Sequence, residues 1–165
     1  MIDVVAVAEK SRYINIDLVK AFLSSLMHRL SRIELSRLGL VVYSRLAAPV
    51  LDLTENAASI VDIYAKIPVM RGIPEPALGV YEACDMIREL SEESLSSRLI
   101  VVIGSFAKKP KNDLEAAISY SESLGVKTML MSTTPRKPSW IPEEIAHTVL
   151  ILRQTNIDRA LRQIL

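Results

Sequence analysis

The stretch from Ile2 to Ala8 is mostly apolar and rich in valine, and it lacks the alternation of a strand that has one face in water. Such a run is typical of a strand buried on both faces, as in a parallel sheet that helices cover on both sides. Arg98–Gly104 has the same character and is the most hydrophobic strand-like run, so we expect it near the sheet centre. These two runs predict a parallel sheet between two layers of helices.

The next segments predict how the sheet begins. The apolar residues of Asp17–Ile33 recur at helical spacing and form one stripe, which predicts a helix that Asn15 or Asp17 can cap. Arg37–Ser44 is predicted to be a second buried strand, and Pro49–Thr54 a third. The segment between these two strands is too short for a parallel crossover, so we expect them to form an antiparallel hairpin.

Helices and strands alternate along the rest of the chain. The remaining predicted helices are Glu55–Lys66, Pro76–Leu90, Asp113–Leu124 and Asn156–Leu165, and the remaining predicted strands are Val126–Met131 and His147–Leu152. This order predicts a single domain over residues 1–165, a Rossmann-like three-layer α/β/α sandwich. Its six-stranded, mostly parallel sheet is expected to have the order 3-2-1-4-5-6, with one antiparallel edge strand.

Composition narrows the class of protein. The formal net charge of the 165-residue chain is +1, so the chain as a whole is neither a polyanion nor a polycation. Its one cysteine, Cys84, cannot form an internal disulfide, which fits a reducing compartment. The longest apolar runs, of about seven residues, are far shorter than the roughly 20 residues of a membrane helix. The start of the chain lacks the basic region of a signal peptide, so we expect a cytoplasmic protein with no membrane contact.

The sequence lacks the usual motifs of catalysis and cofactor binding. Its five glycines are isolated from one another, so they form neither a dinucleotide-binding loop nor a Walker loop. His28 and His147 have no Cys, Asp or Glu at metal-ligand spacing. Cys84 lies on the apolar face of a predicted helix, which indicates a core thiol rather than a nucleophile. We therefore expect no enzymatic activity and no cofactor.

The stretches "DVVAVAEKSRY", "RGIPEPALGVYEA" and "LIVVIGSF", in this order of elements, resemble the von Willebrand factor A domain over nearly the whole chain. "DVVAVAEKSRY" stands where that family has an aspartate, a strand and then Asp-x-Ser-x-Ser, and "RGIPEPALGVYEA" stands in place of its threonine loop and following helix. "LIVVIGSF" occupies the position of the strand that ends in an aspartate and a glycine. The resemblance implies the same fold, together with a role in binding other proteins.

In that family these loops hold Mg²⁺ or a similar hard cation, which needs small oxygen ligands in an octahedron. The resemblance assigns five ligand positions to this chain: Glu9, Ser11, Tyr13, Ile73 at or near the threonine, and Ser105 or Gly104 at the last aspartate. Glu9 is one methylene longer than aspartate, Tyr13 replaces a serine, and Ile73 offers no oxygen. The site is therefore expected to be degenerate and to hold no metal.

Degenerate sites of this kind are similar to those of two branches of the family. One is the A-type domain of the proteasomal ubiquitin-receptor subunit, and the other is the A-type subunit of the transcription and repair factor that holds a helicase. "SRYINID", "RGIPEP" and "VVIGSF" carry this comparison. Both branches are non-enzymatic adaptors, so the resemblance implies an assembly involved in DNA transactions or protein turnover.

The loops expected at the carboxyl ends of the strands are rich in positive charge, and ligands of open α/β sheets usually bind at that edge. The loops hold Lys10, Arg12, Arg45, Arg71, Lys108, Lys109, Lys111, Arg136 and Lys137, nine of the chain's 20 basic residues. The acids in the same loops are Glu9, Glu75 and Asp113. A nearly neutral chain is thus expected to carry a positive edge, which binds a partner or is only solvated surface. If Lys10 or Arg12 holds Glu9 in place of a metal, the loop stays ordered without a cation.

Trp140 lies in the proline-rich loop "TTPRKPSWIPEE", beside this basic edge. Two roles fit it. It either folds back and caps the sheet edge, or it is an exposed anchor for a partner, since tryptophan is enriched at the centres of protein interfaces.

These observations favour a non-catalytic interaction scaffold that binds an acidic segment of another protein. A nucleic-acid partner is less favoured because no aromatic stacking platform is recognisable. Two alternatives remain open. One is a working metal-dependent ligand-binding module of the same fold, and the other is a Rossmann-like protein that binds a small ligand or an anion.

Overall fold

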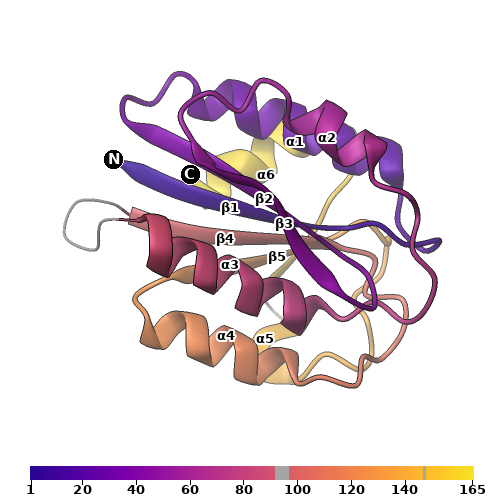
Figure 1. Cartoon of the computed structure of the whole chain (residues 1–165). Helices are drawn as coiled ribbons and strands as arrows, with labels where there is room; N and C mark the ends of the chain where they lie inside the picture. Colours follow the sequence, from indigo (N-terminus) through magenta and orange to yellow (C-terminus); the bar gives the residue numbers. More distant parts are fainter. Residues whose placement is uncertain (92–96, 147) are drawn as a thin grey trace.

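A computed structural model describes residues 1–91, 97–146 and 148–165 and shows one six-stranded sheet between two layers of helices (Figure 1). The sheet order is β3-β2-β1-β4-β5-β6, as the sequence predicts. The strands are β1 (Ile2–Glu9), β2 (Ser36–Tyr43), β3 (Ala47–Thr54), β4 (Ser97–Gly104), β5 (Lys127–Ser132) and β6 (Val149–Ile151).

Strands β1 and β4 form the centre of the sheet, and this confirms the prediction from their continuous apolar runs. They pair with each other in parallel, and β1 pairs in parallel with β2 on its other side. Val5 and Val101 are among the side chains with no exposed surface. The one antiparallel pair is β2 with β3, because a short turn joins them and the backbone N–H of Ser44 donates to the carbonyl of Leu46.

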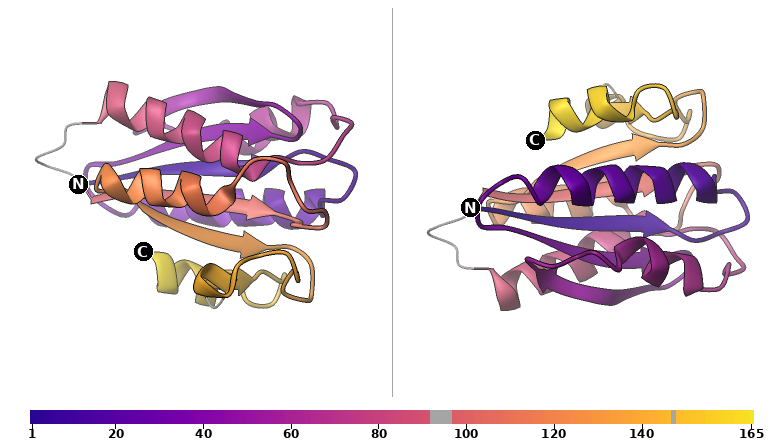
Figure 2. Two further views of the ribbon diagram at one scale, coloured as in Figure 1. Left: turned by 90° about the horizontal axis from the view of Figure 1, so that it is seen from below. Right: turned by 90° about the horizontal axis from the view of Figure 1, so that it is seen from above.

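The helices cover both faces of the sheet. Figure 1 shows α1, α2 and α6 on one face and α3, α4 and α5 on the other, and Figure 2 shows α1 running between α2 and α6. The helices are α1 (Ile16–Leu30), α2 (Ile60–Lys66), α3 (Pro76–Leu90), α4 (Leu114–Ser123), α5 (Glu143–Ala146) and α6 (Ile157–Ile164). Two apolar clusters fill the spaces between the sheet and each helical layer. Among the described residues, no helix has the length and apolar character needed to cross a membrane.

Helix boundaries follow local capping chemistry. The Asn15 side chain accepts from the backbone N–H of Leu18 at 3.1 Å and so caps α1, one of the two caps expected. Helix α1 ends at Leu30 rather than at the predicted Ile33, whose side chain is 37% exposed and so does not continue the buried stripe. Gly125 has a φ of +71° just after α4, the conformation expected of a glycine that ends a helix.

The structure departs from the predicted elements before α2 and before β6. The helix predicted from Glu55 begins only at Ile60, because Thr54 and Asn56 close a turn in which the Asn56 N–H donates to the Thr54 hydroxyl at 3.1 Å. The four-residue helix α5 was not predicted, since one turn is too short to show a helical period. The last strand was predicted from His147, which lies outside the described residues.

Gly79 permits the close approach of α3 to the sheet. A β-carbon at this position would overlap Cγ1 of Val7 and would lie 3.3 Å from the Tyr43 ring. Both of these side chains are fully buried, so they have little room to move. The glycine thus sets how near α3 packs to the ends of β1 and β2.

We predict that Gly79→Ala lowers the free energy of unfolding by about 1–3 kcal/mol, because overpacking outweighs the usual gain from alanine in a helix. Denaturant unfolding followed by circular dichroism measures the change. Ser119→Ala, at an exposed position of α4, is the control and should change stability little. A stabilised Gly79→Ala protein would contradict the packing described here.

Candidate functional site

The carboxyl ends of the parallel strands meet at one edge of the sheet, the right-hand side of Figure 1. Strand β1 ends there at Glu9, β2 at Tyr43 and β4 at Gly104. The loops after these strands contain most of the residues that the sequence singled out. We call this side of the molecule the loop edge and define it by residues 10–15, 44–46, 67–75, 105–113 and 133–142.

At the centre of the loop edge, the Glu9 carboxylate is buried and hydrogen-bonded to two serines. The Ser11 hydroxyl donates to Oε2 at 2.7 Å, and the Ser105 hydroxyl donates to Oε2 at 2.8 Å. The backbone N–H of Ser105 donates to Oε1 at 3.1 Å. Glu9 is 1% exposed and Ser105 has no exposed surface. The three residues thus form a closed network that joins the ends of β1 and β4.

Burial raises the pKa of Glu9 above its usual range, because a charged carboxylate loses hydration inside the protein. The hydrogen bonds from Ser11 and Ser105 oppose this rise, since they stabilise the charged form. Gly104 leaves room for the Tyr43 hydroxyl: a β-carbon there would lie only 2.5 Å from that oxygen, and at 3.4 Å, an ordinary contact distance, from Oε1 of Glu9. The Glu9 carboxylate and the Tyr43 phenol therefore face the same space. Burial is the main cause that raises the pKa of Tyr43, and the charge of Glu9 raises it further.

Lys10 does not contribute to the exposed charge of the loop edge, in contrast to the expectation from its place in a loop. It is 3% exposed, and its ammonium group donates to the backbone carbonyl of Tyr64 at 2.9 Å. The same group lies 4.2 Å from the centre of the Tyr64 ring, a cation–π geometry. Burial lowers the Lys10 pKa. Neighbouring side chains of an extended segment point to opposite sides, so Lys10 turns toward α2 while Glu9 turns toward β4.

The condition that Lys10 or Arg12 holds Glu9 is therefore not met. Serine hydroxyl and amide groups hold this carboxylate, and Arg12 instead donates to the Tyr13 hydroxyl at 2.8 Å with its guanidinium 4.9 Å from that ring. The Tyr64 hydroxyl, which the sequence did not single out, donates to the Glu9 carbonyl at 2.7 Å. The sequence held one signal of a buried polar group at this edge. Tyr43 directly follows the apolar run "LGLVV" and so places a hydroxyl at the end of a buried strand.

The five positions that the resemblance assigns to a cation divide into two groups. Glu9, Ser11 and Ser105 come together, but their oxygens already bond to one another. The Tyr13 hydroxyl accepts from Arg12, and Ile73 presents a side chain that is 41% exposed and has no oxygen. Across residues 1–91, 97–146 and 148–165, no group of three or more His, Cys, Asp or Glu side chains is placed to hold a metal ion.

The acids of the loop edge are engaged in holding its backbone. Glu75 is 5% exposed, and its carboxylate accepts from the backbone N–H groups of Lys111 at 2.8 Å and Asn112 at 3.1 Å. Asp113 caps α4 by accepting from the N–H of Ala116 at 3.2 Å. Both acids were expected only to offset part of the positive charge. Their hydrogen bonds were not predicted, because those of Glu75 join loops distant in the chain and that of Asp113 requires the exact start of α4.

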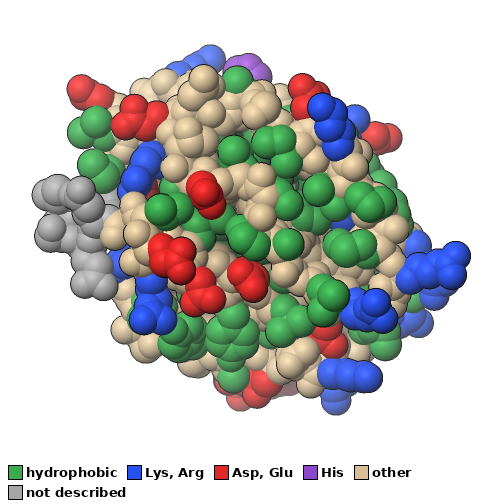
Figure 3. Space-filling view, in the orientation of Figure 1, with side chains coloured by type: hydrophobic (Ala, Val, Ile, Leu, Met, Phe, Trp, Pro, Cys, Tyr) green, Lys and Arg blue, Asp and Glu red, His purple; other side chains and the backbone are tan. Residues whose placement is uncertain are grey.

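The remaining eight basic residues of the loop edge are all exposed. They are Arg12, Arg45, Arg71, Lys108, Lys109, Lys111, Arg136 and Lys137. None of them forms a salt bridge within the described part of the chain. Figure 3 shows lysine and arginine side chains gathered at this end of the molecule, whereas several acidic side chains lie on the face toward the other end.

Trp140 folds back against the protein, one of the two roles considered from the sequence. Its indole N–H donates to the carbonyl of Phe106 at 2.8 Å, and the two rings are 6.1 Å apart. The side chain is half-buried. It nevertheless borders a depression that Lys109, Lys111 and Pro142 also line.

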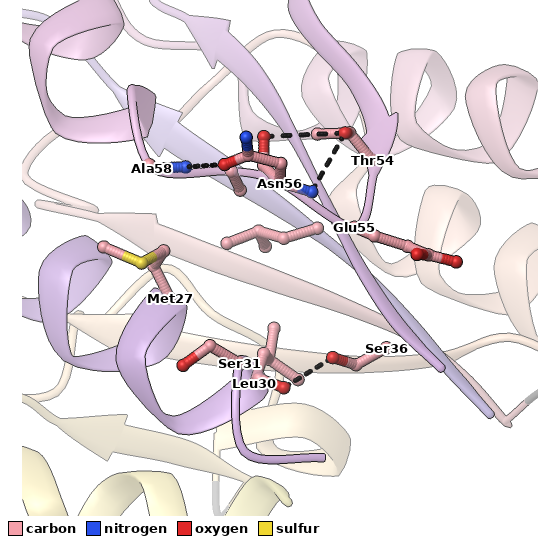
Figure 4. Close-up of a pocket in the computed structure, with 10 residues that line it drawn as sticks. Met27, Leu30, Ser31, Ser36, Thr54, Glu55, Asn56 and Ala58 are labelled. Carbon is pink, nitrogen blue, oxygen red and sulfur yellow. Dashed lines mark hydrogen bonds between the residues drawn. The ribbon is translucent and has the colours of Figure 1, made fainter. Parts of the chain in front are cut away.

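A separate pocket lies at the opposite edge of the sheet, between the end of α1, the start of β2 and the residues after β3 (Figure 4). Its polar groups bond to one another: the Ser36 hydroxyl donates to the Leu30 carbonyl, and the Asn56 side chain accepts from the N–H of Ala58 at 3.4 Å. In Figure 4 the Glu55 carboxylate points away from Met27. No pair of titratable groups converges in the pocket, so its lining offers no acid–base chemistry.

The raised pKa of Glu9 predicts how stability depends on pH. The folded protein binds a proton at Glu9 more tightly than the unfolded chain does, so this group stabilises most below a pH of about 4.5. Its contribution then falls as pH rises through the folded-state pKa. Glu9→Gln should remove this loss of stability, whereas Glu122→Gln, at an exposed position, should leave it in place. The measurement is the free energy of unfolding across pH 4–8. Parallel pH profiles for wild type and Glu9→Gln would contradict the burial described here.

The occupied oxygens of Glu9 and Ser11 predict that no divalent cation binds at this position. Calorimetric titration with millimolar Mg²⁺ or Mn²⁺ should give no saturable heat that disappears when Glu9→Ala and Ser11→Ala are combined. A saturable heat that is lost in the double variant would show a working cation site.

Comparison with known proteins supports the fold. No protein-family model and no curated protein matches the sequence. Among solved structures, the chain is similar to BatB from Bacteroides thetaiotaomicron, with a TM-score of 0.79 and 12% identity over 99% of this chain and 97% of that one. It is also similar to an aerotolerance-related membrane protein from Bacteroides fragilis, with a TM-score of 0.75 and 16% identity over 99% and 96% of the two chains. Proximal thread matrix protein 1 from the mussel byssus gives a TM-score of 0.71 and 14% identity over 98% of this chain and 44% of its own. The chain therefore has the Rossmann-like α/β fold of the von Willebrand factor A type.

Proposed function

We propose that this chain is a non-catalytic protein-interaction domain whose loop edge binds an acidic segment of another protein without a bound metal. The observation that carries the proposal is the separation of charge at this edge. The eight exposed cations have no acidic partner within the described residues, while Glu9, Glu75 and Asp113 accept hydrogen bonds from the protein itself.

Free cations of this kind suit carboxylate recognition. An arginine can donate two parallel hydrogen bonds to one carboxylate, and a lysine can approach it as a compact charge. In metal-dependent domains of this fold, a cation at the loop edge attracts the partner's acid. Here the basic side chains supply positive charge at the same edge, and the Glu9 network keeps the strand ends joined without an ion.

Cys84 and His28 are the side chains that could suggest an enzyme, but neither is suited to catalysis. The Cys84 thiol is fully buried, and burial, with a smaller effect of Asp85, raises its pKa to about 11, so it is not a thiolate near neutral pH. His28 is exposed, and its Nδ1 is paired with the Ser24 carbonyl at 2.8 Å on the same helix. His28 shares a depression with Ser25 and Asp158, but no hydrogen bond or ion pair among the described residues joins it to either side chain.

Nucleic acid is the second candidate partner, because phosphate groups also bind lysine and arginine. Two features disfavour it. The Trp140 ring packs beside Phe106, and the Tyr13 ring lies under the Arg12 guanidinium, so neither forms an open platform for a base. The degenerate cation site, and the adaptors it resembles, point instead to a protein partner within a DNA-transaction or protein-turnover assembly.

The proposal predicts that Lys108→Glu with Lys109→Glu weakens partner binding without lowering the melting temperature. Both residues are exposed loop lysines that contribute little to stability. Binding should also weaken with added salt, because exposed charges are screened over about 8–10 Å at physiological ionic strength. The measurement is affinity capture of partners from extracts of the producing cells, quantified for both proteins at several salt concentrations.

The matched control reverses Arg32 and Lys127, which are exposed but lie outside the loop edge. It should leave capture unchanged. If partners are captured equally by all variants and at all salt concentrations, the partner binds another face, such as a helical flank, and the positive loop edge is only solvated surface.

A further inference from the structure

One part of the loop edge combines exposed apolar side chains with arginines. Two adjoining depressions share Met70, Arg71 and Gly72 and together open beside the turn between β2 and β3. We call them the arginine depression, lined by Arg12, Arg45, Leu46, Val69, Met70 and Arg71. It lies toward the β3 side of the sheet, away from the depression that Trp140 borders.

Backbone hydrogen bonds hold the three segments of this depression together. The N–H of Met70 donates to the Lys10 carbonyl at 3.0 Å, and Ser11 and Met70 form an isolated parallel bridge. The N–H of Glu75 donates to the Ser44 carbonyl at 2.7 Å. Segments 10–12, 44–46 and 69–75 are therefore fixed relative to one another, so a partner meets a surface that is already formed.

Gly72 positions Arg45 within the depression. A β-carbon at residue 72 would lie 3.2 Å from both Cβ and Cδ of Arg45, so the arginine stem runs along the glycine backbone. Gly72 also has a φ of +101°, which other residues rarely adopt. The stem is thus supported by the chain, while the guanidinium has no salt-bridge partner within the described residues.

The apolar members of this region are unusually open to water. Leu46 is 63% exposed and Val69 is 49% exposed, and Ile73 in the same loop is 41% exposed. Large aliphatic side chains that cluster on a surface mark sites of association, and arginine is enriched at the centres of such sites. A purely electrostatic patch would not need these side chains.

We propose that the arginine depression is the docking site for an acidic segment of a partner protein that carries one large apolar side chain. The apolar side chain packs against Leu46 and Val69, and flanking carboxylates pair with Arg45 and Arg71. This inference rests on the proposed function and names the part of the loop edge that recognises the partner. Charge complementarity selects the acidic flanks, and the exposed leucine and valine select the apolar anchor.

The test uses random 12-residue peptides displayed on phage and selected against the full wild-type chain. Selected peptides should carry two or more Asp or Glu residues around a Leu, Ile or Phe. Fluorescence anisotropy of the selected peptides, made with a fluorescein label, then measures their affinity for three variants. Two alter the depression, Arg45→Glu with Arg71→Glu and Leu46→Ser with Val69→Ser, and the third is Lys108→Glu with Lys109→Glu.

Each depression variant should weaken binding by about tenfold or more, because it removes either the ion pairs or the apolar contact. The Lys108 and Lys109 reversal should change the affinity of so short a peptide by less than about threefold, through longer-range charge alone. All substituted side chains are exposed, so melting temperatures should match that of the wild type.

Other outcomes separate this inference from the proposed function. Peptides that depend on Lys108 and Lys109 but not on the depression would overturn the inference and leave the proposed function standing. The inference would also be overturned if no peptide binds the wild type more tightly than the depression variants. Selected peptides that lack acidic and apolar residues would overturn it as well. If no variant changes the affinity of any selected peptide, and a labelled twelve-residue oligothymidine is the only ligand that binds the loop edge, both proposals fail.

Discussion

The buried hydrogen bonds between Glu9, Ser11 and Ser105 organise the loop edge. The Glu9 carboxylate accepts from both serine hydroxyls and from the Ser105 amide, and it thereby joins the ends of β1 and β4. An acid that is one methylene longer than aspartate reaches these donors from the strand end, and Gly104 leaves room beside it for the Tyr43 hydroxyl. The network occupies oxygens that could otherwise ligate a cation, and so these three residues have a structural role.

Charge at the loop edge follows from this arrangement. Glu75 accepts two backbone N–H groups of the loop after β4, and Lys10 turns inward to the Tyr64 carbonyl. The carboxylate of Glu75 and the ammonium group of Lys10 therefore form hydrogen bonds within the protein, while the other eight basic residues of the loop edge remain exposed. A chain with a formal net charge of +1 thus presents one positive end, and the exposed Leu46 and Val69 give that end an apolar component.

The sequence predicted the fold well because its strongest signals are periodic or local. The mostly apolar run of β1 indicated a strand buried on both faces, and the short turn before β3 allowed only an antiparallel pair. The side-chain partners within the site were harder to predict. Whether Lys10 faces water depends on Tyr64, which is 54 residues away, and the role of Glu75 depends on a loop 36 residues away. Such contacts form only when the strand ends meet, and no local pattern encodes them.

We propose that the Glu9 network, rather than a cation, keeps the loop edge ordered. Amide hydrogen exchange of residues 9–13 and 104–106, measured by NMR with a chelator and then with millimolar Mg²⁺, tests this most directly. If the network holds the edge, amide protection should be equal in both conditions, and Ser105→Ala should lower it in both. Protection that appears only when Mg²⁺ is present would show that the edge still depends on a metal ion, and would contradict the account.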